Sequence, residues 1–486
     1  MDKINSITLR GNNTIKDGME SITNSGLRVV LIVDENKKLL GIATDGNIRR
    51  ALLSGKDFNS PIKDIMVTNP ITVQVGTPAT ALLEIMLEKN IYEIPIIDSN
   101  NILKDIALFH ELKTIPLSSP DITYKEVETI KQVLATPFLS IGPKIKEFEK
   151  KIADFVGTKY AVAVNSGTSA LHLCIRSFDI KDGDEVITTP FSFIASANCM
   201  LFERAKPVFV DIDENTLCID ASKIEEKITK KTKAILPVHI FGHPCEMEKI
   251  IEIANLHNLV VIEDACEALG TVYKDKKVGS FGNAGVFSFY PNKPITTSEG
   301  GIVVTNDVNV ARLCQSMRNQ GRDEEDSWLH YSRLGYNYRM SELSAALGVV
   351  QMERVEEILR KRQRIAALYD QKLKGIEGIK TPYLSSSVTK MSWFVYVIRL
   401  DEKRFSREKR NKIMLELEGQ GINCRDYFPS IHLEPFYAKN FGYKRGDFPI
   451  TEMVSDLTIA LPFYNNLAEN EIDYICNSLK IILDKI

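Results

Sequence analysis

Short apolar runs alternate with helix-length segments through the middle of the chain. In order they are YAVAV, DEVITT, PVFVDI, KAILPVHI, LVVIED, GVFSFY and GIVVTND. Apolar and β-branched residues fill most positions of each run, which is typical of strands that are buried on both faces of a parallel sheet. The pattern therefore predicts an α/β core, with a mainly parallel central sheet and helices on both of its faces.

A different pattern follows this core. A helical stretch from about Ser341 to Lys374 precedes the strand-like run SWFVYVIRL and the helix-period segment SREKRNKIMLELEGQG. This order predicts a smaller α+β domain at the C-terminal end. We expect a large domain over residues 117–365 and a small domain over residues 366–486.

An internal repeat occupies the first 115 residues. Residues 30–49 align with residues 94–113, a shift of 64 positions, and a helix-period segment precedes each copy, IKDGMESITNSG and ATALLEIMLEKN. Each copy reads as helix, strand, turn, strand and helix. The segment TIPLSSPD then breaks both periodicities and predicts a linker, so a separate domain is expected over residues 1–116.

Composition narrows the function classes. The 61 Lys and Arg residues nearly balance the 64 Asp and Glu residues, so no overall field favours nucleic acid or an anionic membrane. No apolar run approaches the ~20 residues of a membrane helix. The 8 Cys residues include no C-x-x-C pair, so we expect reduced thiols, no metal and a cytoplasmic protein.

The ends of the predicted strands carry the candidate chemistry, because ligands of open α/β sheets bind there. AVAVNSGTSALHL reads as a strand, a tight turn at Gly167 and a helix that begins near Thr168, which suits a phosphate. The strand LVVIED ends in Asp264, a carboxylate that needs a partner when it is buried. A phosphate site and a buried acid are therefore expected at one edge of the sheet.

Two further strand ends complete the pattern. TTPFSFIAS places an aromatic ring, Phe193, just after a strand, and FSFYPNK ends a strand with Ser288 and then Lys293. A phosphate cradle, a buried acid, an aromatic face and an isolated lysine match the needs of pyridoxal phosphate. The lysine amine bonds the aldehyde of this cofactor, and the acid keeps its pyridine nitrogen protonated.

From about residue 120 onward the chain resembles a DegT-type nucleotide-sugar aminotransferase, a family of fold-type I enzymes that use pyridoxal phosphate. The matching motifs include VIEDACEALG, SFYPNKPITTSEGG and GYNYRMSELSAALG, in that order. The resemblance implies that Lys293 bonds the cofactor and that Asp264 contacts the pyridine nitrogen. The other implied contacts are Gly167, Thr168 and Ser288 with the phosphate, Phe193 with the ring, and Asn337 with the phosphate of the neighbouring subunit of a homodimer.

Glu267 departs from the family pattern, which often has Gln at this place. It follows Asp264 by three residues and is expected beside the phenolic oxygen of the cofactor. A carboxylate would repel a phenolate, so Glu267 either shares a proton there or turns away. Lys293 itself is present, whereas relatives with His at that position carry out dehydration.

The resemblance also implies the reaction. Glutamate is the expected donor, and the acceptor is a nucleotide-linked keto sugar, aminated at carbon 4 of a dideoxyhexose for surface polysaccharide. A dehydratase or epimerase that uses pyridoxal phosphate and a nonenzymatic regulator are the alternatives. The candidate substrate contacts are Arg339, Tyr427, His239 and His432, of which the two histidines could equally be structural.

The repeat at the front of the chain resembles a tandem pair of cystathionine-beta-synthase-type (CBS) domains, which commonly bind adenine nucleotides. In that family a Thr or Ser and an Asp after the second strand hold ribose and phosphate, and Thr44 and Asp45 match them. The second copy has Leu108 and Phe109 there, which cannot hydrogen-bond a ribose. Either a regulatory nucleotide binds at Thr44 and Asp45, or the pair only mediates contacts within an oligomer.

Overall fold

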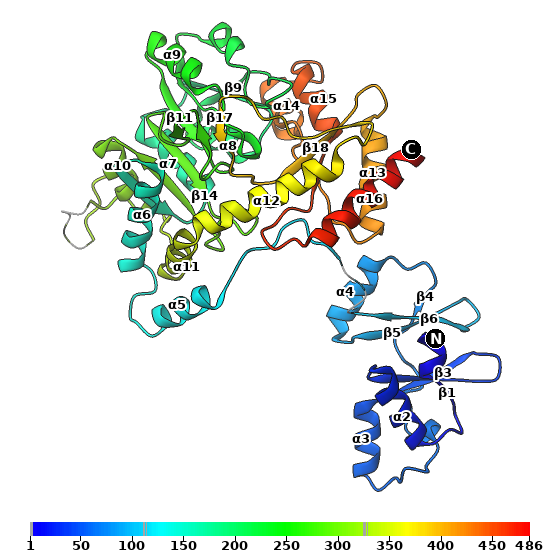
Figure 1. The fold of residues 1–486 in the computed structure, drawn as a ribbon. Helices are drawn as coiled ribbons and strands as arrows, with labels where there is room; N and C mark the ends of the chain where they lie inside the picture. Colours follow the sequence, from blue (N-terminus) through cyan, green and yellow to red (C-terminus); the bar gives the residue numbers. More distant parts are fainter. Residues whose placement is uncertain (1–2, 110–111, 113, 324–326, 328) are drawn as a thin grey trace. The chain divides into compact units, whose positions relative to one another are not determined.

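The computed structural model describes residues 3–486 apart from 110, 111, 113, 324–326 and 328. The chain forms two compact units, which are coloured along the sequence in Figure 1. One comprises Met1–Ile115 with Glu418–Ile422, and the other comprises Pro116–Leu417 with Asn423–Ile486.

A seven-stranded sheet lies at the centre of the larger unit. Its strands, in spatial order, are β7 (Tyr160–Val164), β15 (Gly301–Thr305), β14 (Ala284–Ser288), β11 (Val260–Asp264), β10 (Thr232–Ile235), β8 (Glu185–Thr188) and β9 (Lys206–Phe209). Only β15 runs antiparallel to its neighbours within this sheet. The seven predicted strands thus form one sheet, and the predicted α/β class is confirmed.

Helices of the larger unit surround this sheet. They are α5 (Tyr124–Leu134), α6 (Pro143–Val156), α7 (Gly167–Ser177), α8 (Ala195–Leu201), α9 (Met247–His257) and α10 (Val308–Arg318). α7 packs on β7, β14 and β15, whereas α9 packs on β10 and β11. One continuous apolar core joins the buried strands to these helices, so the sheet ends are held rigidly.

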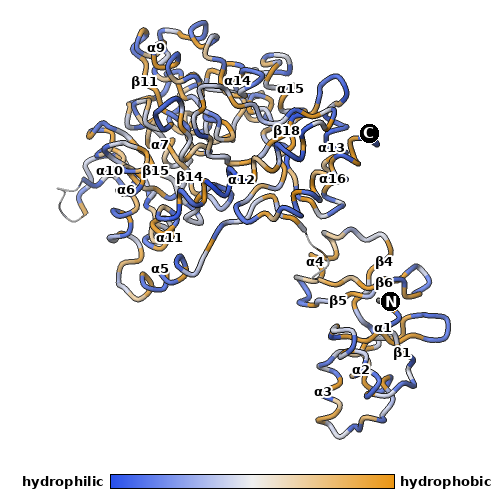
Figure 2. The backbone as a smooth tube through the Cα atoms, in the orientation of Figure 1, coloured by the Kyte–Doolittle hydropathy of each residue, from blue (hydrophilic) through white to orange (hydrophobic). Residues whose placement is uncertain are grey.

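The rest of the larger unit comprises further helices and two small sheets. The helices are α11 (Glu342–Glu353), α12 (Val355–Leu373), α13 (Arg407–Gly419), α14 (Pro435–Phe441), α15 (Pro449–Leu457) and α16 (Glu469–Lys485). One sheet has the order β16 (Ile379–Lys380), β18 (Tyr396–Leu400) and β19 (Thr458–Leu461), and the other has the order β13 (Lys276–Lys277), β12 (Val272–Tyr273) and β17 (Val388–Lys390). Hydrophobic and hydrophilic residues alternate along α16 in Figure 2, as expected for a helix with one buried face.

The predicted strand over residues 392–400 begins only at Tyr396. Trp393 has φ 53°, in the left-handed region, and this takes the backbone out of the strand. The buried guanidinium of Arg362 donates to the carbonyls of Trp393 and Phe394, each at 2.6 Å. The Arg362 side chain thus provides the hydrogen bonds to these carbonyls that a neighbouring strand would have provided.

The predicted long helix from 341 to 374 is two helices, α11 and α12, separated at Arg354. The Arg354 guanidinium lies in a buried cluster, where it donates to Asp121 Oδ1 at 2.9 Å and to Glu126 Oε1 at 2.7 Å. Lys361 and Asn465 donate to the second oxygen of Asp121, at 2.8 and 3.2 Å. This cluster ties the segment that begins the larger unit to both helices.

The smaller unit is a structural repeat. Each copy has a three-stranded sheet: β1 (Thr8–Arg10), β2 (Val29–Val33) and β3 (Leu39–Thr44), then β4 (Val73–Gln74), β5 (Glu93–Ile97) and β6 (Leu103–Leu108). The helices of this unit are α1 (Lys3–Ile7), α2 (Ile15–Ser25), α3 (Asp45–Leu53) and α4 (Ala79–Lys89). The last helix predicted for the second copy falls mostly on 110–113, largely outside the described residues.

The two copies are joined symmetrically. Leu39 N–H donates to the Asn101 carbonyl at 3.0 Å, and Leu103 N–H donates to the Lys37 carbonyl at 2.9 Å, so both bonds obey the shift of 64 positions. Lys37 and Asn101 both have positive φ, at 62° and 64°. β2, β3, β5 and β6 then share one apolar cluster. The predicted internal repeat is therefore confirmed as two paired copies of one fold.

Within the described residues, no helix has the length and apolar composition needed to cross a bilayer.

We expect Asp121→Asn to lower the free energy of unfolding of the larger unit by about 2 kcal/mol at pH 7. Burial opposes the charge of Asp121, but hydrogen bonds from Lys361, Arg354 and Asn465 outweigh it and lower its pKa to about 2. The stabilisation is therefore complete above the pKa of the unfolded chain, near 4, and is lost as the pH falls toward 2.

Urea unfolding of both proteins between pH 7 and pH 3 measures this difference. Asp154→Asn on the exposed side of α6 is the matched control and should change stability little. A deficit of Asp121→Asn that stays constant over this pH range would contradict the expected role of the charge.

Candidate active site

Lys293 lies in a tight turn that follows β14. Its N–H donates to the Tyr290 carbonyl at 2.9 Å, and its side chain is only 11% exposed. The Nζ atom lies 3.5 Å from Glu267 Oε1 and 3.8 Å from the centre of the Phe394 ring. The ammonium is therefore held between a carboxylate and an aromatic face, where it is paired although it is nearly enclosed.

Asp264 ends β11 and is 4% exposed. Its Oδ2 accepts a hydrogen bond from Ser196 Oγ at 2.6 Å, and its Oδ1 accepts one from the Cys266 N–H at 3.1 Å. Ser196 in turn contacts Ser192 Oγ at 2.7 Å. Two hydroxyl groups thus support and orient a buried carboxylate at the end of a strand.

Glu267 does not turn away from the site. Its Oε2 accepts from the Phe241 N–H at 2.8 Å, while its Oε1 faces Lys293. Burial raises the pKa of Glu267, and the nearby Lys293 charge only partly offsets this rise. Of the two alternatives left by the sequence, the structure favours a carboxyl group that stays in the site.

The turn before α7 has the backbone arrangement expected of an anion cradle. α7 begins at Gly167, and Ser166 Oγ accepts from the Ser169 N–H at 3.1 Å. The N–H groups of Gly167 and Thr168 in the first turn have no acceptor within their own helix. A Cβ atom at Gly167 would lie 2.9 Å from Ser288 Cβ, so the absence of a side chain lets β14 approach this turn.

These residues fit pyridoxal phosphate. The helix N-terminus at Gly167 and the Ser288 side chain suit its phosphate, Asp264 suits its ring nitrogen, and Lys293 suits its aldehyde. Phe193 is 59% exposed, which leaves an aromatic face available for stacking. The donor set needed by this cofactor is therefore present in one rigid unit.

Two predicted substrate contacts are enclosed instead. His239 is 0% exposed; its Nε2 lies 3.1 Å from Glu263 Oε2, and its Nδ1 accepts from the Cys245 N–H. His432 is also 0% exposed, with its Nε2 3.0 Å from Glu452 Oε1. Both imidazoles are enclosed, which favours the structural alternative that the sequence left open for each of them.

Tyr427 lies close to Lys293 through an aromatic stack. Its ring is 6.4 Å from the Phe394 ring, centre to centre, with 13° between the planes. Burial raises the pKa of Tyr427, and the Glu267 carboxylate adds to this effect. Tyr427 therefore contributes an un-ionised phenol to the surroundings of the lysine.

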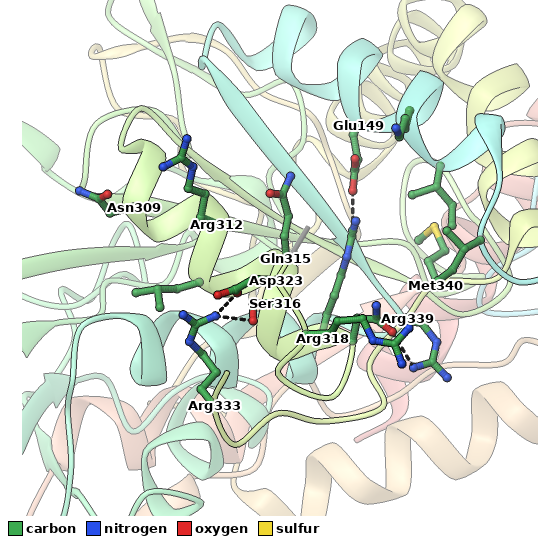
Figure 3. A pocket seen from close by; sticks show the side chains of 16 residues that line it. Glu149, Asn309, Arg312, Gln315, Ser316, Arg318, Asp323, Arg333, Arg339 and Met340 are labelled. Atoms are coloured by element: carbon green, nitrogen blue, oxygen red, sulfur yellow. Dashed lines mark hydrogen bonds and ion pairs between the residues drawn. The ribbon is translucent and has the colours of Figure 1, made fainter. Parts of the chain in front are cut away.

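Arg339 lines a basic pocket with a volume of about 850 Å³ (Figure 3), and its backbone pairs with Val164 at the end of β7. Its guanidinium donates to Asn319 Oδ1 at 3.1 Å. Arg318 pairs with Glu149 in this pocket, and Arg333 pairs with Asp323. Its lining has more basic than acidic side chains, which favours an anionic ligand.

Asn337 is exposed, and its backbone lies close to the anion cradle. Its carbonyl accepts a weak hydrogen bond of 3.4 Å from Asn165 Nδ2, one residue before the N-cap of α7. Its backbone pairs with Asn319. The segment is fixed at the edge of the sheet while the Asn337 side chain remains open to other groups.

The sequence pattern missed several members of this site. Ser192 and Ser196 lie in a loop and a short helix where nothing in the spacing indicates contact with Asp264. The sequence pattern places Phe394 in a strand, and Phe241 contributes only through its backbone N–H. The sequence offers one signal for these contacts, which is a pair of serines shortly after the end of a predicted strand.

Comparison with known proteins supports the same assignment. Residues 120–480 match the model of the DegT/DnrJ/EryC1/StrS aminotransferase family, and residues 1–54 and 62–107 match CBS domains. GDP-perosamine synthase of Caulobacter vibrioides is 39% identical over 375 residues, 77% of this chain and 99% of that protein. SpsC of Bacillus subtilis, a spore coat polysaccharide biosynthesis protein, is 37% identical over 379 residues, 76% of this chain and 97% of that protein.

A solved structure agrees with these sequence relatives. PseC of Helicobacter pylori, an aminotransferase of pseudoaminic acid biosynthesis, superimposes with a TM-score of 0.73 at 31% identity, over 77% of this chain and all of that chain. About a quarter of this chain thus has no counterpart in these three proteins.

We expect Ser196→Ala to weaken cofactor retention about tenfold, because Asp264 loses a buried hydrogen bond worth about 1–3 kcal/mol. Dialysis of the purified variant against buffer, followed by an absorbance assay for bound cofactor, measures this loss. Ser192→Ala is the matched control, since it removes the next hydroxyl but leaves the bond to Asp264. Equal retention by Ser196→Ala and the unmodified protein would contradict the role of the serine.

Proposed function

Since the chain belongs to the DegT/DnrJ/EryC1/StrS aminotransferase family, we propose that it transfers an amino group from glutamate to a nucleotide-linked keto sugar. It is a nucleotide-sugar aminotransferase that depends on pyridoxal phosphate. The proposed acceptor atom is carbon 4 of a dideoxyhexose that is used for surface polysaccharide. The observation that carries the proposal is the paired, nearly enclosed Lys293 in a site with a buried Asp264.

When bound, pyridoxal phosphate supplies an aldehyde for amines and a ring that stabilises negative charge on the substrate carbon. Lys293 would hold the aldehyde carbon of the cofactor, and its free amine would move the proton at the substrate carbon. Asp264, oriented by Ser196, holds a proton on the ring nitrogen. The amides of Gly167 and Thr168 would bind the phosphate, and Phe193 would offer its ring for stacking on the cofactor.

The alternatives to this function are a dehydratase or epimerase and a nonenzymatic regulator. A dehydratase of this family has His where this chain has Lys293, and a nonenzymatic regulator would have no need for a buried lysine, a supported acid and an anion cradle in one place. Burying such charges costs free energy, so their joint presence favours catalysis.

Tyr427 and Arg339 are our candidates for contact with the substrate. Tyr427 stacks on the ring that lies against Lys293, so it is suited to the sugar end. Arg339 lines a pocket rich in arginine, which is suited to a diphosphate. We assign the two residues to opposite ends of the nucleotide-linked sugar.

We expect purified protein to be yellow, and Lys293→Ala to lose both turnover and any borohydride-reducible link while it still folds. The reason is that only a primary amine at this position can bond the aldehyde. Mass spectrometry after borohydride reduction should find the added mass on the peptide that contains Lys293. Turnover at the original rate in the alanine variant would contradict the assignment.

The donor and the acceptor are tested together. Glutamate should bleach the visible absorbance, and a panel of nucleotide-linked 3-keto and 4-keto sugars should then restore it only with a 4-keto member. Restoration by a 3-keto sugar alone would move the amination to carbon 3. Release of water or an epimer without amine transfer would favour the dehydratase or epimerase.

We also propose a homodimer in which Asn337 reaches the phosphate of the neighbouring subunit. Phe138, Leu139, Ile141 and Leu334 are 48–71% exposed. The Leu139 carbonyl accepts from the Glu342 N–H, so this apolar segment lies beside the loop that carries Asn337. Apolar residues exposed next to a site loop are suited to a subunit contact.

Mixing Lys293→Ala chains with Asn337→Ala chains should restore part of the activity, because each hybrid dimer then holds one site with neither change. Turnover after subunit exchange measures the recovery, and a mass difference between tagged chains confirms the exchange. Absence of recovery despite confirmed exchange would show that each site uses residues of one chain only.

For the CBS pair we propose binding of an adenine or cytidine nucleotide at Thr44 and Asp45, with modest control of the enzyme. Thr44 caps α3 through a 3.2 Å bond from the Asn47 N–H, and Asp45 pairs with Arg49. Both residues therefore have local structural roles, which is compatible with the alternative of an oligomer contact. Asp45 and Arg49 nevertheless lie at the exposed start of the helix, where a ligand can reach them.

A nucleotide should raise the melting temperature of the full chain and change turnover by about 5- to 150-fold at most, the usual range of coupling between sites. Asp45→Asn should abolish both effects without changing basal turnover, because Asp45 lies outside the catalytic unit. Calorimetry against a nucleotide panel measures the binding. Failure of every nucleotide to bind would favour the oligomer contact.

A further inference from the structure

The pairing of Glu267 with Lys293 raises the question of how the lysine loses a proton. The answer rests on the proposed function, in which the Lys293 amine bonds the aldehyde. A lysine amine attacks an aldehyde only when it is neutral. In this structure the Nζ atom lies 3.5 Å from Glu267 Oε1, in a site where both side chains are nearly enclosed, at 11% and 6% exposure. Water is therefore poorly placed to take the proton that the ammonium must lose.

The other titratable groups around Glu267 are unsuited to that task. Asp264 has both oxygens engaged, by Ser196 and by the Cys266 N–H. Burial raises the pKa of the Cys266 thiol well above its ordinary value, and the same cause raises that of Tyr427, so both stay protonated. Glu267 is the carboxyl group in contact with the Nζ atom among the described residues.

We propose that Glu267 is the proton-accepting partner of Lys293. The Nζ–H bond breaks, its proton passes to Oε1, and the ion pair becomes a neutral amine beside a neutral carboxyl group. The proton returns to the same nitrogen when the lysine is released. No other reactant is needed, since the pair holds one proton throughout.

The geometry around Glu267 suits this exchange. Its second oxygen, Oε2, is fixed by the Phe241 N–H at 2.8 Å, so Oε1 keeps facing the lysine. Phe241 has φ 55°, and this left-handed residue aims its N–H at the carboxyl group. The Phe394 ring also attracts the ammonium, but it has no acceptor for the proton.

A glutamine at position 267 separates this role from a structural one. Its amide oxygen can still accept from Phe241, but it cannot hold a proton. In the unmodified protein the exchange within a one-proton pair does not depend on pH, so capture of the cofactor should be nearly flat between pH 6 and pH 8. In Glu267→Gln the ammonium must lose its proton to solvent, so capture should rise about tenfold per pH unit below the ordinary lysine pKa.

The experiment mixes apo protein with pyridoxal phosphate across this pH range, stops the reaction with borohydride and quantifies the added mass on the Lys293 peptide. At pH 7 we expect capture by Glu267→Gln to be slower by on the order of a hundredfold. Glu299→Gln, which changes an exposed carboxylate of the same loop, is the control and should behave like the unmodified protein.

Two outcomes would overturn the proposal. If Glu267 only anchored the ammonium, its removal would favour the neutral amine, and Glu267→Gln would capture the cofactor faster at every pH. If both proteins gave the same pH profile, the carboxyl group would have no part in the proton transfer. Failure of the unmodified protein to capture the cofactor at Lys293 would instead contradict the proposed function, and with it this inference.

Discussion

The central constraint on the larger unit is that charged side chains at the ends of buried strands must be stabilised where water has little access. β11 and β14 are apolar because helices cover the sheet, yet Asp264 ends one strand and Lys293 follows the other. Each charge is stable there only because a fixed partner meets it. Ser196 supports Asp264, and Glu267 with the Phe394 ring supports Lys293. The shape of the site follows from these pairings.

The same requirement explains why parts distant in sequence converge. Asp264 needs a hydroxyl from α8, Lys293 needs a ring from the segment before β18, and Glu267 needs a backbone N–H from the turn after β10. The cluster of Asp121 with Arg354 and Lys361 is a second example, away from the site. Polar groups thus connect the large and C-terminal parts of this unit at a few fixed points, and apolar packing fills the space between them.

The front unit is built by another rule, an internal symmetry. Asp34 Oδ1 accepts from the N–H groups of Asn36 and Lys38, and Asp98 Oδ1 accepts from those of Asn100 and Ile102 in the same way. The repeat was visible in the sequence because these turns need the same residue types. The difference between the copies is also chemical, since Thr44 caps a helix where Leu108 ends a strand. Any ligand of this unit would therefore meet two unequal sites.

The sequence by itself determined the strands of the central sheet, the repeat and the residues at the strand ends, because periodicity and motifs are local along the chain. It also singled out Lys293, Asp264 and Gly167, whose proposed roles rest on residue type, position and the family motifs. Only the tertiary structure decided that Glu267 faces Lys293, that His239 and His432 are enclosed, and that Arg362 replaces a strand partner. These facts depend on contacts between residues far apart in the chain, and no local pattern encodes which buried polar group will meet which partner.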